Sequence, residues 1–207
     1  MVGNGGMKTW DQRYSQPGYK YGTEPNRFLV EQEPRFPAGS RVLLPGDGEG
    51  RNSVWLAERG HQVLAVDNSQ VGLDKAVALA SARGTTITTL HADLAVWTPP
   101  PATCSGLALI FVHLPAAIRT DVHRRLTRAL APGGWLILET FHPCQAGYES
   151  GGPRDADMLC DLACARADFS PLLEEVLVWE GEVVLHEGDG HRGRAFVTRY
   201  VGRMPPA

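Results

Sequence analysis

A glycine-rich turn in the first quarter of the sequence has the residue types and spacing needed to bind a nucleotide-like ligand. Gly46, Gly48 and Gly50 form a G-x-G-x-G pattern between the apolar run 41–45 and a helical pattern that starts near Ser53. Glycine is needed where the backbone takes positive φ or where a ligand lies too close for a Cβ atom. A strand, a glycine turn and a helix N-terminus together make such a site. The alternative is an ordinary tight connection between strand and helix.

The position of the third glycine separates two classes of ligand. The dinucleotide fingerprint G-x-G-x-x-G would place it where this sequence has Arg51, one residue after Gly50. The spacing therefore argues against NAD and disfavours a nucleotide-dependent oxidoreductase.

Two acidic residues end the next two predicted strands. Asp67 lies about 20 residues after the first glycine, the distance at which a carboxylate meets ribose hydroxyls. Capping of the following helix is the alternative role, but Ser69 is better placed for it. At Asp93, the carboxylate can accept from the exocyclic amine of adenine while the Leu94 backbone N–H addresses a ring nitrogen. The alternative for Asp93 is a helix or turn cap.

Strand and helix patterns alternate through the centre of the chain, which predicts a parallel sheet with helices on both faces. The last quarter instead predicts an antiparallel hairpin with the turn 187–193. The predicted strands are 41–45, 62–66, 86–90, 107–112, 135–140, 174–186 and 195–201. Pro132-Gly133-Gly134 is expected to end the preceding helix before the strand 135–140, and a short helix is expected within 159–169.

The N-terminal segment carries several aromatic residues, including Trp10 and Tyr21, outside the core pattern. These rings suit a flap that shields a ligand from water, and the alternative is that they cover the edge of the sheet. Thr23 is predicted to cap a helix that has Pro25 in its first turn. Residues 1–9 are glycine-rich and are expected to be a flexible N-terminus.

Composition and charge predict an ordinary globular protein with a small-molecule substrate. The 207 residues fit one large domain, 10–207, with 43% hydrophobic and 21% charged residues. A net charge of -3 gives no basic face for nucleic acid. No basic leader and no apolar run of membrane length is present, so we expect a cytoplasmic protein without a membrane partner. We also expect a monomer or a homodimer.

The cysteines show no metal-binding pattern. Cys160 and Cys164 are four residues apart without companion histidines at zinc spacing, and neither Cys104 nor Cys144 completes a C-x-x-C pair. We expect free thiols in a reducing compartment and no metal.

With the glycines, Asp67 and Asp93 at successive strand ends, the chain from Trp10 to Arg203 resembles class I S-adenosylmethionine (SAM) methyltransferases. It resembles more narrowly the tellurite-resistance and thiol methyltransferase-like group. This narrower likeness rests on 48–52 (GEGRN) with Leu56-Ala57 after it, on Tyr21-Gly22 with Pro25-Asn26, and on His113-Leu114-Pro115. The resemblance implies a single-domain, Rossmann-like α/β fold whose mostly parallel sheet is finished by an antiparallel hairpin.

The resemblance also implies SAM as the cofactor and S-adenosylhomocysteine as its product. It places the three glycines against the SAM amino acid, Asp67 on the ribose, Asp93 and Leu94 at the adenine, and the backbone after Ile110 beside the methionyl part. Leu44 stands where many of these enzymes have an acidic residue, so the SAM ammonium would need a main-chain carbonyl, Asp47 or Glu49. Further expected cofactor contacts are Trp10, Tyr21, Arg51, Asn68, Ser69, Phe111 and Val112.

The expected reaction is methyl transfer to a small acceptor such as a thiol or a tellurite- or selenite-like oxyanion. The alternative is a protein that binds SAM or S-adenosylhomocysteine without turnover. Alignment of the reactants can supply ~7–11 kcal/mol of the barrier, and a general base matters only for a protonated acceptor. Candidate bases near strand ends, each with a structural role as its alternative, are His113, Glu139, His142 and His186.

His191 and Arg192, on the predicted hairpin turn, are the preferred acceptor residues. The stretch 188–193 is longer than the two residues of a minimal hairpin, and extra loop length at a binding edge is often functional. Arginine can hold an oxyanion with two parallel hydrogen bonds, and histidine titrates near neutral pH. A solvated turn without a role is the alternative.

Overall fold

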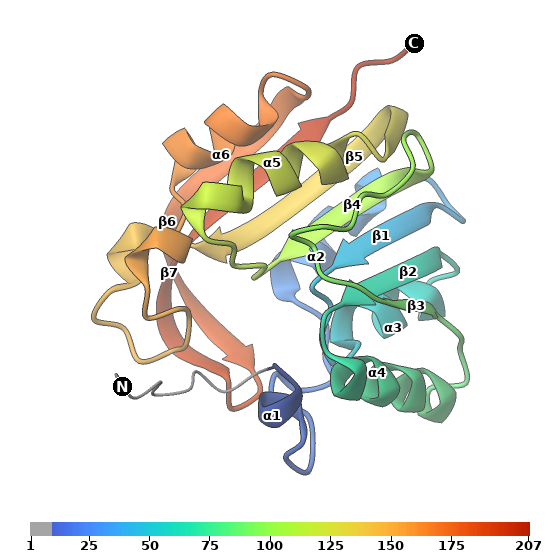
Figure 1. The fold of residues 1–207 in the computed structure, drawn as a ribbon, viewed down its shortest axis with the longest axis vertical. Helices are drawn as coiled ribbons and strands as arrows, with labels where there is room; N and C mark the ends of the chain where they lie inside the picture. Colours follow the sequence, from blue (N-terminus) through green and yellow to red (C-terminus); the bar gives the residue numbers. More distant parts are fainter. Residues whose placement is uncertain (1–9) are drawn as a thin grey trace, which may run out of the picture.

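One seven-stranded sheet with the strand order β3-β2-β1-β4-β5-β7-β6 organises the molecule (Figure 1). The computed structural model describes residues 10–207. Strands β1 to β5 pair in parallel, and β7 runs antiparallel to both β5 and β6. The predicted fold class is thereby confirmed. Because β1 lies between β2 and β4, the strand order reverses there, which is where ligands bind in open α/β sheets.

Helices lie on both faces of this sheet, as the alternating pattern predicts. The strands are β1 Arg41–Pro45, β2 Gln62–Asp67, β3 Thr88–His91, β4 Cys104–Ile110, β5 Leu130–Phe141, β6 Glu174–Glu187 and β7 His191–Arg203. The α-helices are α1 Trp10–Tyr14, α2 Arg27–Gln32, α3 Arg51–Glu58, α4 Gln70–Ala82, α5 Ala116–Thr127 and α6 Leu162–Phe169. Short 3₁₀ turns are η1 Glu33–Arg35, η2 Pro143–Gln145 and η3 Ala156–Met158.

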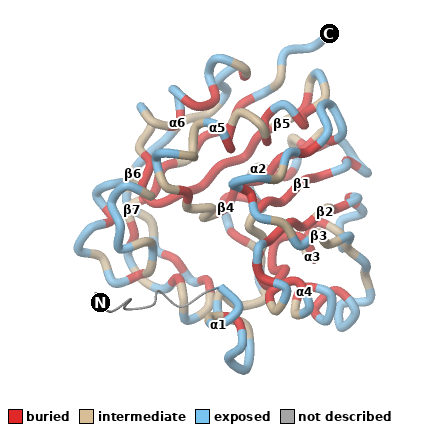
Figure 2. Tube along the Cα trace, viewed as in Figure 1, coloured by how far each residue is buried: buried red, intermediate tan, exposed pale blue. Residues whose placement is uncertain are grey.

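The core is divided by the sheet into two apolar layers. Along β1, Leu43 packs in the layer that contains Val122 of α5, whereas Leu44 packs in the layer that contains Leu29 of α2. Figure 2 shows the central strands as the most continuously buried part of the chain. Parallel strands that are covered on both faces carry continuous apolar runs, so the sequence of 41–45 suits its place.

Two local predictions are corrected by the structure. Helix α2 is capped by Asn26, whose side chain accepts from the backbone nitrogen of Leu29 at 2.8 Å, and not by Thr23. Strand β5 begins at Leu130, because Leu130 pairs with Cys104 and Trp135 pairs with Gly106. The segment 132–134 is therefore a bulge within the strand, whereas the prediction placed it between the preceding helix and the strand.

The hairpin between β6 and β7 is tighter than predicted. Glu187 pairs with His191, so only 188–190 form the turn and the prediction of a long loop at 187–193 is wrong. Gly188 has φ 62°, and a Cβ atom there would lie 2.3 Å from the backbone nitrogen of Gly22. The glycines of this turn pack directly against the N-terminal segment.

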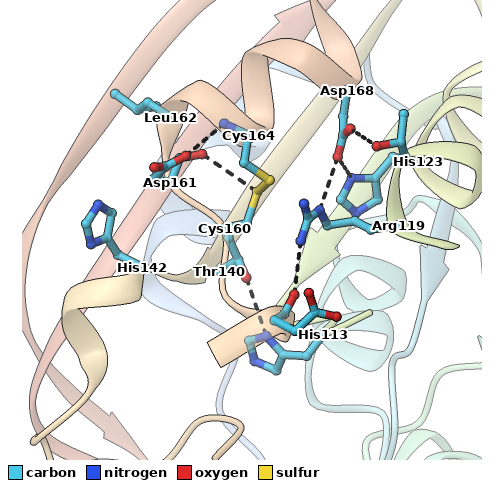
Figure 3. Close-up of a disulfide and its surroundings, with 12 residues drawn as sticks. His113, Arg119, His123, Thr140, His142, Cys160, Asp161, Leu162, Cys164 and Asp168 are labelled. Carbon is cyan, nitrogen blue, oxygen red and sulfur yellow. Dashed lines mark hydrogen bonds and ion pairs between the residues drawn. A yellow bond between two sulfur atoms is a disulfide. The ribbon is translucent and has the colours of Figure 1, made fainter. Parts of the chain in front are cut away.

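Cys160 and Cys164 form a disulfide at the start of α6 (Figure 3), which corrects the prediction of four free thiols. Asp161 caps the helix between them and accepts from the Cys164 nitrogen at 2.8 Å. One cysteine thus lies just before the helix and the other in its first turn, with 5.5 Å between their Cα atoms, which suits a disulfide. Cys104 and Cys144 are free.

No helix within residues 10–207 is both long and apolar enough to cross a bilayer. The prediction of a flexible N-terminus at 1–9 lies outside the described residues.

Candidate functional site

The glycine turn between β1 and α3 has the backbone that its sequence predicts. Gly46, Gly48 and Gly50 have φ of 66°, 64° and 90°, the left-handed region that other residues rarely adopt. A Cβ atom on Gly50 would lie 2.6 Å from the Cβ atom of Ala76 in α4. The third glycine therefore also permits the close packing of α3 and α4.

Asp67 joins the end of β2 to this turn. One of its carboxylate oxygens accepts from the Gly48 nitrogen at 2.9 Å, and the other accepts from the Ser69 nitrogen at 2.9 Å. Burial raises the pKa of Asp67, although hydrogen bonds from the backbone of Ser69 and Gly48 oppose this effect. Each oxygen retains a lone pair that a hydroxyl group can use. The ribose role of Asp67 stays a prediction.

Of the two acidic candidates for an ammonium group, only Asp47 lacks a cationic partner. Glu49 is engaged, with one oxygen 2.8 Å from Lys75 Nζ and the other accepting from the Lys20 nitrogen at 2.7 Å. Asp47 accepts from the hydroxyl group and backbone of Ser53 and has no ion pair within residues 10–207. Desolvation by the surrounding protein, together with the nearby Asp67, raises its pKa to about 6.

Arg51 supplies the complementary charge beside Asp47. It is 7% exposed, and its Nη1 is buried without a hydrogen-bond partner in the described residues. The Asp47 carboxylate, which has no ion pair in the described residues, can bind the ammonium group of an amino acid. The Arg51 nitrogen without a hydrogen bond there can bind its carboxylate group. The residues at the glycine turn thus fit the amino-acid part of SAM.

At the strand ends expected near ribose and adenine, the structure shows local caps. Ser69 caps α4 by accepting from the Gly72 nitrogen at 3.1 Å, which confirms that prediction. Asn68 next to it is exposed. Asp93 is exposed and accepts from the Ala95 nitrogen at 2.9 Å, the turn cap that was its alternative role. The adenine role of Asp93 and Leu94 stays a prediction.

Helix α1 covers the glycine turn and the start of α4 (Figure 1). The side chain of Tyr14 lies between two glycines, since an added Cβ atom would lie 2.5 Å from its hydroxyl oxygen at Gly48 and 3.0 Å from its ring at Gly72. Asp11 holds the helix there by accepting from the hydroxyl group of Ser69. The N-terminal segment therefore lies where the flap hypothesis places it. Tyr14 belongs to the aromatic segment of the flap hypothesis, but the sequence alone did not identify it as an individual site residue.

A cluster of aromatic and histidine rings lies at the carboxyl ends of β4 and β5. The His191 ring is 4.4 Å from Tyr21, 4.6 Å from Phe111 and 5.2 Å from Phe141, measured between centroids. His113 stacks on Phe141 at 5.5 Å. Phe111 has φ 54°, and such strained positions are concentrated at functional sites.

Both histidines of this cluster favour the neutral form. Burial, followed by the neighbouring His191, lowers the pKa of His113 to about 3. Its Nδ1 lies 3.5 Å from the hydroxyl oxygen of Thr140 (Figure 3). Burial also lowers the pKa of His191, although a contact with Glu187 opposes this effect. At neutral pH these imidazoles carry no positive charge.

The hairpin separates the predicted acceptor residues onto two faces. His191 is buried, whereas His186 and Arg192 form an exposed cross-strand pair, because successive residues of a strand face opposite sides. The structure therefore brings His113 and His191 together but not His186 or Arg192. His142 also lies apart, with its Nε2 3.5 Å from Glu180.

A hollow of about 550 Å³ lies beside the cluster, in the loop after β5. Its lining includes Tyr148, Gly151 and Arg154. A Cβ atom on Gly151 would lie 2.7 Å from Cδ2 of His191, so the hollow adjoins the His191 ring.

A buried polar network joins the cluster to the glycine turn. Asn26 Nδ2 donates to Glu139 and, at 2.8 Å, to Glu187. Arg199 pairs with Glu139 at 2.6 Å, and Arg51 pairs with Glu187 at 2.7 Å. Asn26 and Glu187 were missed as site residues. Strand alternation offered one signal, since it places Glu187 on the same face as the apolar Leu185.

Within residues 10–207, no group of three or more histidine, cysteine or acidic side chains is arranged to hold a metal ion.

The comparisons with known proteins agree with this geometry. Residues 42–134 match a family model described as a methyltransferase domain. This segment contains the glycine turn and Asp67, so the part of the chain that is similar to a methyltransferase domain includes the proposed cofactor residues at β1 and β2. Among curated relatives, a 2-heptyl-1-hydroxyquinolin-4(1H)-one methyltransferase of Mycobacteroides abscessus is 29% identical over 54% of this chain and 51% of its own. The tRNA 5-carboxymethoxyuridine methyltransferase of Escherichia coli is 33% identical over 56% of this chain and 45% of its own. The matches thus span about half of each relative.

Solved structures show the same fold. TehB from Haemophilus influenzae has a TM-score of 0.69 at 16% identity, covering 84% of this chain and 61% of its own. A structure described as "Conversion of a Disulfide Bond into a Thioacetal Group during Echinomycin Biosynthesis" has a TM-score of 0.72 at 17% identity. The match covers 93% of this chain and 89% of the other chain. At these identities the likeness concerns the fold.

Proposed function

We propose that the protein is a SAM-dependent methyltransferase that acts on a small acceptor, either a thiol or a tellurite- or selenite-like oxyanion. The observation that carries the proposal is the 2.9 Å hydrogen bond from the Gly48 nitrogen to Asp67. It fixes the left-handed glycine turn to the end of β2 at the point where the strand order reverses.

The residues proposed to bind the cofactor lie at three strand ends, and each strand end would bind a different part of SAM. Asp47 and Arg51 would hold the ammonium and carboxylate groups, Asp67 the ribose, and Asp93 with Leu94 the adenine. Tyr14 and the rest of α1 would exclude water from above the glycine turn. When bound, SAM supplies a methyl group on a positively charged sulfur atom.

The remaining residues align the acceptor and manage its proton. Alignment dominates the rate, because methyl transfer disperses charge and needs no covalent help from the protein. For a protonated acceptor, His191 is our first candidate to accept the proton and His113 is the second. Arg192 and His186, on the exposed face of the hairpin, would steer an anionic acceptor toward this edge.

The acceptor class is supported by the resemblance to the thiol and tellurite group, by the TehB-like fold and by a local similarity to a relative. A Thiopurine S-methyltransferase of Bordetella petrii is 44% identical over 20% of this chain and 19% of its own. We further propose a cytoplasmic monomer or homodimer that requires no nucleic acid or membrane.

A screen with methyl-labelled SAM tests this proposal across thiols, selenium and tellurium oxyanions and small carboxylates. We expect transfer to a thiol or an oxyanion, and a lower rate for Arg192→Ala with an anionic acceptor than with a neutral one. The exposed Arg27→Ala serves as a control for loss of surface charge. SAM binding without transfer to any acceptor would favour the alternative of a binding protein.

A further inference from the structure

Glu187 and His191 face each other across the hairpin at the base of the aromatic cluster. They are paired residues of β6 and β7, and both side chains are at least nine-tenths buried. The Nδ1 atom of His191 lies 3.6 Å from Oε2 of Glu187. This separation is within ion-pair range, and such contacts at catalytic sites tighten when substrate binds.

The carboxylate of Glu187 is held from two further elements. Asn26 donates to its Oε1 at 2.8 Å, and Arg51 donates to its Oε2 at 2.7 Å. Burial alone would favour the neutral acid, but the contacts with His191 and Arg51 outweigh burial and lower the pKa of Glu187 to about 2. The side chain is thus negatively charged at neutral pH.

Within residues 10–207, Nδ1 of His191 is buried without a hydrogen bond, and its 3.6 Å contact with the carboxylate of Glu187 favours a proton on that nitrogen. A neutral ring with its hydrogen on Nδ1 would leave the Nε2 lone pair available. Nε2 forms no hydrogen bond within residues 10–207, and the neighbouring ring atom Cδ2 adjoins Gly151 and the hollow. The carboxylate also stabilises the charged ring that forms when Nε2 takes a proton.

We propose that Glu187 is a positioning residue that holds His191 in the tautomer able to accept a proton from the methyl acceptor. The inference rests on the proposed methyl transfer. The S–H or O–H proton of the acceptor passes to Nε2 of His191. The electron pair left on sulfur or oxygen forms the bond to the methyl group as the bond from that group to the cofactor sulfur breaks. SAM, when bound, would supply this methyl group and be left as a neutral thioether, and His191 would then release its proton to water.

Glu139 provides a matched control for a purely structural role. Like Glu187 it is a buried glutamate that accepts from Asn26 and pairs with an arginine, Arg199. Within residues 10–207 it makes no ion pair or hydrogen bond with His191. Glu139→Gln therefore disturbs the same network without removing the carboxylate that faces the histidine.

The first measurement follows His191 directly by ¹⁵N NMR of histidine-labelled protein across pH, without any acceptor. We expect Nδ1 to be protonated and Nε2 unprotonated in the wild type. Glu187→Gln should lower the titration midpoint of His191 by about one unit or more, whereas Glu139→Gln should not. Other charged or titratable groups that face His191 are Arg51, Lys20, Tyr21 and His113, and all are unchanged in these variants.

The second measurement follows turnover of a protonated acceptor. Glu187→Gln should lower kcat by about 10- to 100-fold and change the SAM Kd by less than about threefold. Glu187→Asp, which keeps the charge beside Arg51, should recover part of the rate and serves if the glutamine variant does not fold. In a His191→Asn background, Glu187→Gln should lower kcat no further.

An unchanged tautomer and midpoint in Glu187→Gln would overturn the proposal, as would an equal loss of kcat in the His191→Asn background. A wild-type protein that methylates no acceptor would refute the proposed function instead, and the NMR result would still decide what Glu187 does to His191.

Discussion

At the scale of single residues, Asp67 combines a structural and a proposed binding role. Its two oxygens hold the Gly48 and Ser69 backbone nitrogens, so the carboxylate shapes the turn before any ligand arrives. The same oxygens are the predicted acceptors for ribose hydroxyls. Removing the side chain should therefore loosen the turn and weaken the cofactor together.

Asp67→Ala should weaken SAM binding by about 10- to 100-fold, since each hydrogen bond to a charged group contributes about 1.5–3 kcal/mol before water replaces part of the loss. Asp67→Asn should lose less affinity for SAM, because one oxygen acceptor remains. Asp93→Ala should also lose less, because Asp93 is exposed and the Leu94 backbone is retained. Calorimetry showing wild-type affinity for Asp67→Ala would limit this residue to shaping the turn.

The raised pKa of Asp47 predicts that SAM binding depends on pH. The folded value of about 6 lies above the ordinary value of 3.8, so the folded apo-protein binds the extra proton and its stability falls as pH rises through this window. A bound ammonium group favours the ionised carboxylate. Affinity should therefore be constant above about pH 7 and fall as pH drops below about 6, by up to about tenfold per unit.

Asp47→Asn tests this assignment. Calorimetry at several pH values between about 5 and 7.5 should show that this variant binds SAM more weakly than the wild type near pH 7.5. The affinity of the variant should also depend less on pH. Asp67, whose pKa is also raised, accounts for the remaining dependence. An asparagine variant with the full wild-type dependence would assign the ammonium group to another partner.

At the scale of elements, the start of α6 is fixed both by a helix cap and by a covalent bond. Asp161 caps the helix, and the Cys160–Cys164 bond closes the same turn. The Cys160 nitrogen also donates to the carbonyl oxygen of Phe141 at 3.1 Å, so this turn is attached to the end of β5 beside the aromatic cluster. The disulfide should therefore stabilise the acceptor side of the molecule.

Cys164→Ser should lower stability by about 2 kcal/mol, the value expected for closing a very short loop, and should lower Tm by about 4–8 °C in a domain of this size. Wild-type protein in a dithiol reductant should show the same loss, and Cys144→Ser should not, because Cys144 is exposed and free. Titration of the denatured, unreduced protein should count two thiols. Four thiols, with no effect of reductant on Tm, would restore the prediction from sequence.

At the scale of the whole molecule, the topology collects the site at one edge of the sheet. The glycine turn, Asp67, Phe111 and His113 follow β1, β2 and β4, and parallel strands bring their carboxyl ends to the same edge. Figure 1 shows the hairpin of β6 and β7 reaching down to α1 at this side of the molecule. The glycine turn and His191 thus come from distant parts of the chain.

The sequence predicts those parts that depend on short-range physics. Positive φ at Gly46, the Ser69 cap and the alternation of strands and helices all follow from residue type and spacing. Contacts between distant segments do not follow from residue type and spacing. The Asn26–Glu187 hydrogen bond joins residues 161 positions apart, and it exists only because the hairpin packs on the N-terminal segment.

Competition between neighbouring residues explains two local errors. Thr23 and Asn26 are both good helix caps, and the choice of Asn26 follows from its burial between two carboxylates. On the predicted loop, Arg192 and His191 are equally good candidates for contact with the acceptor. The pairing of Glu187 with His191 turned that loop into strand and sent the two side chains to opposite faces.

The central claim is that this edge of the sheet binds SAM and not a nicotinamide dinucleotide, and a thermal-shift experiment with SAM, S-adenosylhomocysteine and NAD tests it most directly. A ligand at one hundred times its Kd stabilises the fold by about 2.7 kcal/mol, which should raise Tm by roughly 5–10 °C. We predict this shift with SAM and with S-adenosylhomocysteine and none with NAD. A shift with NAD and none with SAM would contradict the assignment of the site.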